Sequence, residues 1–180
     1  MDYQTRGTER PPLFFKVLFA ASTALAFGVL AYSLAYSYTT GNDVIGESLV
    51  DSEFPPPNVS PLFLKPVTWL MVLAVISWYS FVELVKERVQ ALGRTQRSVV
   101  LLLLLLAAVI SLYEVLFNFM LWGVILVKQG ASSSSFNPDS VVNTFPTDAY
   151  KINLVAATKF YLTVLACSVY GLAVLHKKKA

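Results

Sequence analysis

The sequence predicts an all-α membrane protein, a four-helix transmembrane bundle with both termini cytoplasmic. Of its 180 residues, 56% are hydrophobic and only 14% are charged. The mean hydropathy is +0.60, whereas a soluble domain carries about a quarter charged residues. A soluble domain of this length would need more polar surface than these few charges supply. The totals therefore argue against a soluble enzyme and for a multi-pass membrane protein.

Four apolar runs organise the chain as a single membrane domain, at about residues 13–38, 67–85, 98–127 and 152–175. Each run is long enough to cross about 30 Å of hydrocarbon, which takes about 20 helical residues. A helix in a soluble core seldom stays apolar on every face for that length. The run at 98–127 is the longest, so we expect it to tilt or to push one end into the headgroups.

The basic residues that flank the runs predict the orientation. Ten lie on one side, namely Arg6, Arg10, Lys16, Lys86, Arg88, Arg94, Arg97, Lys177, Lys178 and Lys179, and three lie on the other, namely Lys65, Lys128 and Lys151. By the positive-inside rule, both termini and the loop 86–97 are cytoplasmic, and the segments 39–66 and 128–151 are external. We expect a multi-pass protein of a cell or organelle membrane. This topology explains the net positive charge without a nucleic-acid partner.

Two further observations concern modification and metals. Asn58-Val59-Ser60 fits a glycosylation sequon in the first external segment, so Asn58 is a possible glycosylation site. The chain has one cysteine, Cys167, and one histidine, His176, so no zinc or haem pattern exists. We expect neither a metal site nor a cofactor.

Polar residues inside the runs are the candidates for function. Ser111, Glu114 and Asn118 share one helix face by their i, i+3, i+7 spacing. An ionised acid at that depth costs about 2.5–3.5 kcal/mol, so the face should point at protein or water. Glu114 could carry a proton or cation or contact a ligand, or the stripe could only hold helices together by hydrogen bonds. In the second run, Glu83 shares a comparable face with two serines, Ser77 and Ser80.

Small residues predict how the helices pack. Lys159, Thr163, Cys167 and Gly171 recur every four residues in the last run, and Ala20, Ala24 and Gly28 do so in the first. Small side chains let membrane helices approach closely, so both stripes are predicted packing faces. They should be buried against another helix, from this chain or from a partner.

A salt bridge between Glu114 and Lys159 is not expected. Measured inward from Lys128 and Lys151, Glu114 is 14 residues deep and Lys159 only 8. At about 1.5 Å per residue, their depths differ by roughly 9 Å. A lysine near a helix end can extend toward the surface. We therefore expect Lys159 to point outward or to meet a partner near the depth of Asn118.

Three functions are compatible with these features. The first is a small non-catalytic subunit that stabilises larger subunits of an energy-converting, oxidase- or monooxygenase-like, or transport complex. The second is a small proton or cation pathway built around Glu114, and the third is a membrane enzyme acting on a lipid or quinone. The sequence favours the first, because small-residue faces are abundant and no catalytic set is visible. The expected partners are the lipid bilayer and other membrane subunits or further copies of the chain.

Overall fold

The computed structural model describes residues 13–40, 49, 52, 54, 64–132 and 154–176. These residues form four helices, α1 (Leu13–Thr40), α3 (Pro66–Gln90), α4 (Arg94–Ser132) and α6 (Leu154–His176). All four are long and apolar enough to cross a membrane, as the sequence predicts. The other regular feature within the described residues is a single antiparallel β-bridge between Phe54 and Leu64.

The helix ends follow local chemistry. Pro66 occupies the first turn of α3, where its missing N–H has no partner to lose. This helix continues past its apolar run to Gln90, and α4 begins at Arg94 after a short turn. The backbone N–H of Arg97 donates to the carbonyl of Gly93 at 2.9 Å and closes the first turn of α4. The predicted loop 86–97 is therefore largely helical.

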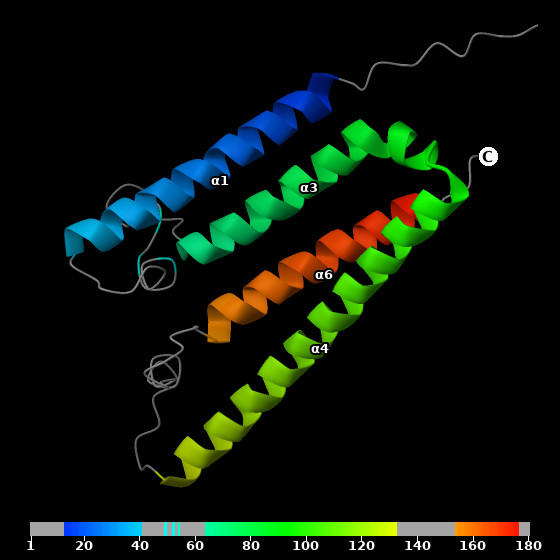
Figure 1. The fold of residues 1–180 in the computed structure, drawn as a ribbon. Helices are drawn as coiled ribbons and strands as arrows, with labels where there is room; N and C mark the ends of the chain where they lie inside the picture. Colours follow the sequence, from blue (N-terminus) through cyan, green and yellow to red (C-terminus); the bar gives the residue numbers. More distant parts are fainter. Residues whose placement is uncertain are drawn as a thin grey trace, which may run out of the picture.

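The bundle takes the form of an open row. The extensive contacts join α1 to α3, α3 to α6 and α6 to α4, so the two outer helices of the row, α1 and α4, do not pack on each other (Figure 1). Lipid is as apolar as a leucine side chain, so no hydrophobic effect drives such a row to close around a core. Each helix uses only the faces that fit a neighbour.

The contact between α1 and α3 is built on small hydroxyl side chains. Ser22, Ser33 and Ser37 are buried together with Val29 on the side of α1 that faces α3. The hydroxyl of Ser22 lies 2.8 Å from that of Ser77 on α3, and 2.7 Å from the carbonyl of Leu18 in its own helix. A serine can satisfy its hydroxyl within its own helix, so it packs like a small residue without an unpaired group.

Two aromatic clusters flank this contact. Phe15 of α1 meets Tyr79 of α3 with ring centroids 5.9 Å apart. Phe19 of α1 meets Phe81 of α3 at 6.0 Å. Edge and tilted ring contacts of this kind add to the packing of the helices.

The contact between α4 and α6 has a regular seam. Ala108, Ser111, Val115 and Asn118 are the buried residues of α4, and their spacing alternates between three and four residues. Such spacing places one stripe against an antiparallel neighbour. On α6, Gly171 is buried against α4. A Cβ added to it would lie 3.0 Å from Cδ1 of Leu104.

The basic end of the molecule is shared by all four helices. Arg97 near the start of α4 donates to the carbonyl of Leu175 near the end of α6. Arginine at a helix C-terminus satisfies a carbonyl that has no partner within the helix and complements the helix dipole. Lys16, Lys86, Arg88 and Arg94 are exposed at the same end. The helix ends that the sequence assigns to one side of the membrane thus meet at one end of the fold.

Replacing Gly171 by valine tests the seam between α4 and α6. Because the new Cβ would press on Leu104 at 3.0 Å, we expect unfolding in mixed micelles to require about 1–3 kcal/mol less. The matched control is Gly28→Val on α1, where no atom lies within 4 Å of an added Cβ. Both variants change the intrinsic helix propensity by the same amount. Equal losses of unfolding free energy would therefore show that Gly171 is not packed tightly against Leu104.

Candidate functional site

The polar stripe of α4 lies mainly in the seam with α6. Ser111 and Asn118 are buried, at 2% and 5% exposure, and Glu114 lies half-buried at the edge of the seam. The Nδ2 atom of Asn118 is enclosed and has no hydrogen-bond partner among the described residues. A buried donor without a partner is costly in a membrane, so this amide stands out in the stripe.

Glu114 and Lys159 do not meet. The ammonium of Lys159 donates to the hydroxyl of Thr68 on α3 at 2.7 Å. The ion pair in the described part of the chain joins Glu83 and Lys86 instead. Thr68 belongs to the first turn of α3, so Lys159 extends toward the helix ends opposite the basic end, as the depth argument predicts.

The stripe on α6 divides between two neighbours. Thr163 donates its hydroxyl to the carbonyl of Lys159 at 2.8 Å and so stays within its own helix. The carbonyl of Cys167 accepts a hydrogen bond of 2.8 Å from the indole of Trp78 on α3, while the free thiol is half-buried. Gly171 contacts α4 through Leu104. The stripe is therefore not one packing face: Cys167 meets α3 through its backbone, and Gly171 meets α4.

The polar residues predicted on α3 also separate. Ser77 faces α1 through Ser22, as described above, whereas Glu83 faces α6. Ser80 between them is fully buried and donates to the carbonyl of Ile76 at 2.8 Å. A spacing of six residues turns a helix by about 240°, so Ser77 and Glu83 reach different neighbours.

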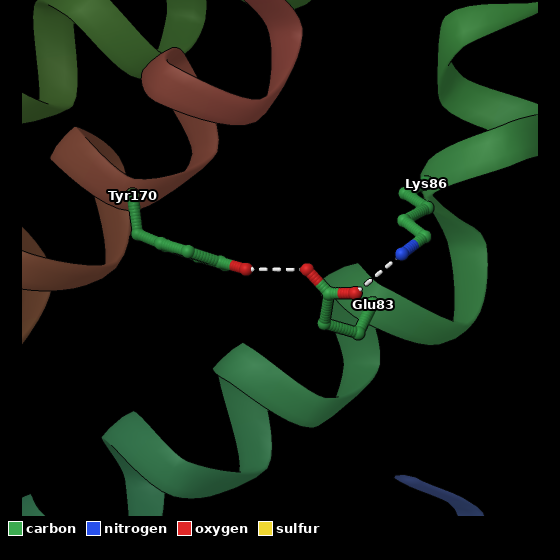
Figure 2. A network of polar contacts seen from close by, with 3 residues as sticks. All are labelled: Glu83, Lys86 and Tyr170. Carbon is green, nitrogen blue, oxygen red and sulfur yellow. Dashed lines mark hydrogen bonds and ion pairs between the residues drawn. The ribbon is translucent and has the colours of Figure 1, made fainter. Parts of the chain in front are cut away.

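Glu83 is the centre of a polar network between α3 and α6. Figure 2 shows its carboxylate between Tyr170 and Lys86. The hydroxyl of Tyr170 donates to Oε1 at 2.7 Å, and the ammonium of Lys86 donates to Oε2 at 2.7 Å. The Glu83 side chain is 15% exposed and that of Lys86 is 45% exposed. Two donors on two oxygens stabilise an ionised carboxylate near the basic end.

Tyr170 is the functional neighbour that the sequence analysis missed. It carries no charge and breaks no pattern on α6. The sequence nevertheless offered one signal. Glu83 and Tyr170 each lie about two turns from the basic end of their helices, and the two helices run parallel. The ring of Tyr79 lies beside that of Tyr170, with the two ring centroids 5.1 Å apart.

The small-residue face of α1 lies on the opposite side from α3. Ala20, Ala24 and Gly28 are exposed, and no atom of the described residues lies within 4 Å of a Cβ built on Gly28. None of the other three helices that the structure describes packs on this predicted face. Serines form the contact with α3 instead, as described above.

Two further predictions concern a metal site and a glycan. No group of three or more histidine, cysteine, aspartate or glutamate side chains in the described ranges could hold a metal ion. Asn58, the possible glycosylation site, lies outside the described residues.

No family model, curated protein or solved structure matches this chain. A proposed function therefore rests on the arrangement of the helices and on their contacts.

Replacing Tyr170 by phenylalanine tests the network at Glu83. The change removes one hydrogen bond to a carboxylate, which costs about 1.5–3 kcal/mol of unfolding free energy. Lys86→Met is the matched control, because an exposed ion pair contributes only about 0–1 kcal/mol. Unfolding in mixed micelles measures both. A larger loss in Lys86→Met than in Tyr170→Phe would show that the tyrosine does not hold α6 to α3.

Proposed function

We propose that this chain is a small non-catalytic membrane subunit that packs against larger subunits of a membrane complex and stabilises them. The complex would be energy-converting, oxidase- or monooxygenase-like, or a transporter. The observation that carries the proposal is the uncovered small-residue face of α1. Ala20, Ala24 and Gly28 are exposed along one side of a helix whose other side is already packed on α3.

The position of that face supports a partner helix. Small side chains offer lipid little contact surface, but they let a second helix approach closely and gain van der Waals contact. α1 is an outer helix of the row, so its free side is accessible to another protein over most of its length (Figure 1). The open space around Gly28 leaves room for a backbone at close range.

The polar stripe of α4 supports a second candidate, a proton or cation pathway. Asn118 has an unpartnered amide and Glu114 lies one turn away. The stripe from Ser111 to Asn118 covers only about 10 Å, however, and a path across the membrane must cover about 30 Å. The α4 residues that flank the stripe, 99–110 and 119–127, include no charged side chain. The accessory subunit is therefore the better supported function.

The orientation that we propose places both termini in the cytoplasm. It rests on the ten-to-three division of basic residues. The described members of the group of ten lie at one end of the fold, where Arg97 donates to the carbonyl of Leu175.

Single cysteines introduced into a Cys167→Ala background test this orientation. An impermeant maleimide added to intact cells should label Ser133→Cys and should fail to label Gln96→Cys until the membrane is opened. Gln96 is exposed in the structure, so protection there reports the membrane and not burial. The reverse labelling pattern would refute the proposed topology.

Purification in a mild detergent tests the subunit proposal. The chain should co-migrate with other membrane proteins, and Gly28→Leu should reduce that association because a bulky side chain holds the partner backbone away. Leu25→Phe is the control, since it adds bulk at an exposed position of α1 outside the small-residue face. Migration of the unaltered chain alone as a monomer would count against the proposal, as would equal effects of the two changes.

A further inference from the structure

The far end of α4 projects beyond its neighbour. α4 has 39 residues and α6 has 23. Arg97 contacts Leu175, and Leu104 lies against Gly171. Counting along the antiparallel pair from these contacts, the first residue of α6 is level with about residue 120 of α4. At about 1.5 Å per residue, the remaining turns of α4 therefore extend about 18 Å past α6. Figure 1 shows that the far end of α4 projects beyond the start of α6.

This projecting segment, residues 121–132, is too far from the basic end to stay in hydrocarbon. From Arg97 to Val127 the helix is about 45 Å long, whereas the hydrocarbon is about 30 Å thick. A fit by tilting alone would need roughly 48°, above the usual limit of about 40°. Trp122 occurs just before the last apolar turns, at a level that suits an interfacial tryptophan. Val124 and Val127 therefore face headgroups or water.

Those apolar side chains are not covered by any helix that the structure describes. Val124 is 64% exposed and Val127 is 73% exposed. The far end of α1 differs, because Ser33 and Ser37 are buried there and the Phe54 ring lies 4.8 Å from that of Tyr32. In the projecting part of α4, by contrast, no described side chain is buried.

The surface of this end is shaped to receive a helix. Met120, Gly123, Val124 and Val127 line an apolar groove on α4. Their i, i+3, i+4, i+7 spacing is that of the four residues that form a hole for a knob in a helix pair. No atom lies within 4 Å of a Cβ built on Gly123, so the floor of the groove is open.

We propose that the groove of Met120, Gly123, Val124 and Val127 receives the same segment of α4 from a second copy of this chain. All copies insert in one orientation, so a two-fold axis along the membrane normal brings two projecting ends to the same height. Helices that only span the hydrocarbon would not reach this level. The second copy has the same excess length, and pairing removes both apolar ends from water at once. Met120 and Val127 supply knobs on each side of the gap left by Gly123.

This inference is independent of the accessory-subunit proposal, since it uses a different helix. A dimer of this kind could occur with or without larger partners on α1.

Disulfide cross-linking in the native membrane tests the dimer. In a Cys167→Ala background, Met120→Cys should give, on mild oxidation, a dominant band at twice the chain mass of 19.9 kDa. Phe119→Cys is the matched control. It lies one residue away at nearly the same depth and is 59% exposed against 71% for Met120, but it points about 100° around the helix. The Phe119→Cys band should be several-fold weaker.

A second variant separates contact from misfolding. Gly123→Leu should fill the groove, and since no described atom lies within 4 Å of a Cβ at this position, the thermal stability of the protomer should not fall. The Met120→Cys cross-link should fall several-fold in that background. Two differently tagged copies should also co-purify, and Gly123→Leu should abolish this.

Three results would overturn the proposal. Equal cross-linking at Met120 and Phe119 would show chance encounters, and no cross-linking at either position would show that α4 meets no second copy. A cross-link from Met120→Cys to a different protein would assign the groove to another subunit. That last result would leave the accessory-subunit proposal intact, whereas loss of co-migrating proteins with an intact dimer would remove only that proposal.

Discussion

The structure depends on one constraint, that a polar group in hydrocarbon can find a partner only within the protein; among the described residues the Nδ2 atom of Asn118 departs from it. Water is not available there, so an unpaired donor or acceptor costs several kcal/mol. The hydroxyls of Ser80, Thr158 and Thr163 meet this requirement by donating to carbonyls four residues earlier in their own helices. They are then small side chains without unpaired groups, and helices can pack on them closely. The α1–α3 contact, with serines in place of alanine and glycine, follows from the same reasoning.

The same constraint explains where the longer polar side chains lie. Glu83 and Lys159 both occupy the first or last turns of the packed helices, where a partner on a neighbouring helix can reach them. Glu83 receives Tyr170, and Lys159 reaches Thr68, so each polar contact joins α6 to α3 near one end. The indole of Trp78 joins the same pair between those ends by donating to a carbonyl of α6. These three hydrogen bonds fix the relation of the two central helices.

The sequence predicts the helices of this fold better than it predicts the contacts between them. Length and hydropathy predict the four helices because crossing hydrocarbon imposes a minimum apolar length, and the structure confirms all four. The choice of faces is harder to predict. A small residue is equally compatible with a helix neighbour or with lipid, so Gly28 and Gly171 look alike in sequence although only Gly171 is packed. Tyr170 was not predicted either: its depth matches that of Glu83, but the sequence does not show which helix lies beside α6.

An open row has a consequence for function that a closed bundle would not have. In a closed bundle each helix hides its distinctive face inside, and the surface that meets lipid is uniform. Here the two outer helices each use one side for the fold and keep another free. Those free sides differ, since α1 presents the small residues Ala20, Ala24 and Gly28 and α4 presents large apolar residues on the turns that project past α6. Small residues gain from a close backbone inside the membrane, whereas apolar residues outside it gain from leaving water. The two free sides therefore suit two different kinds of contact, one through close backbone approach and one through burial of large apolar side chains.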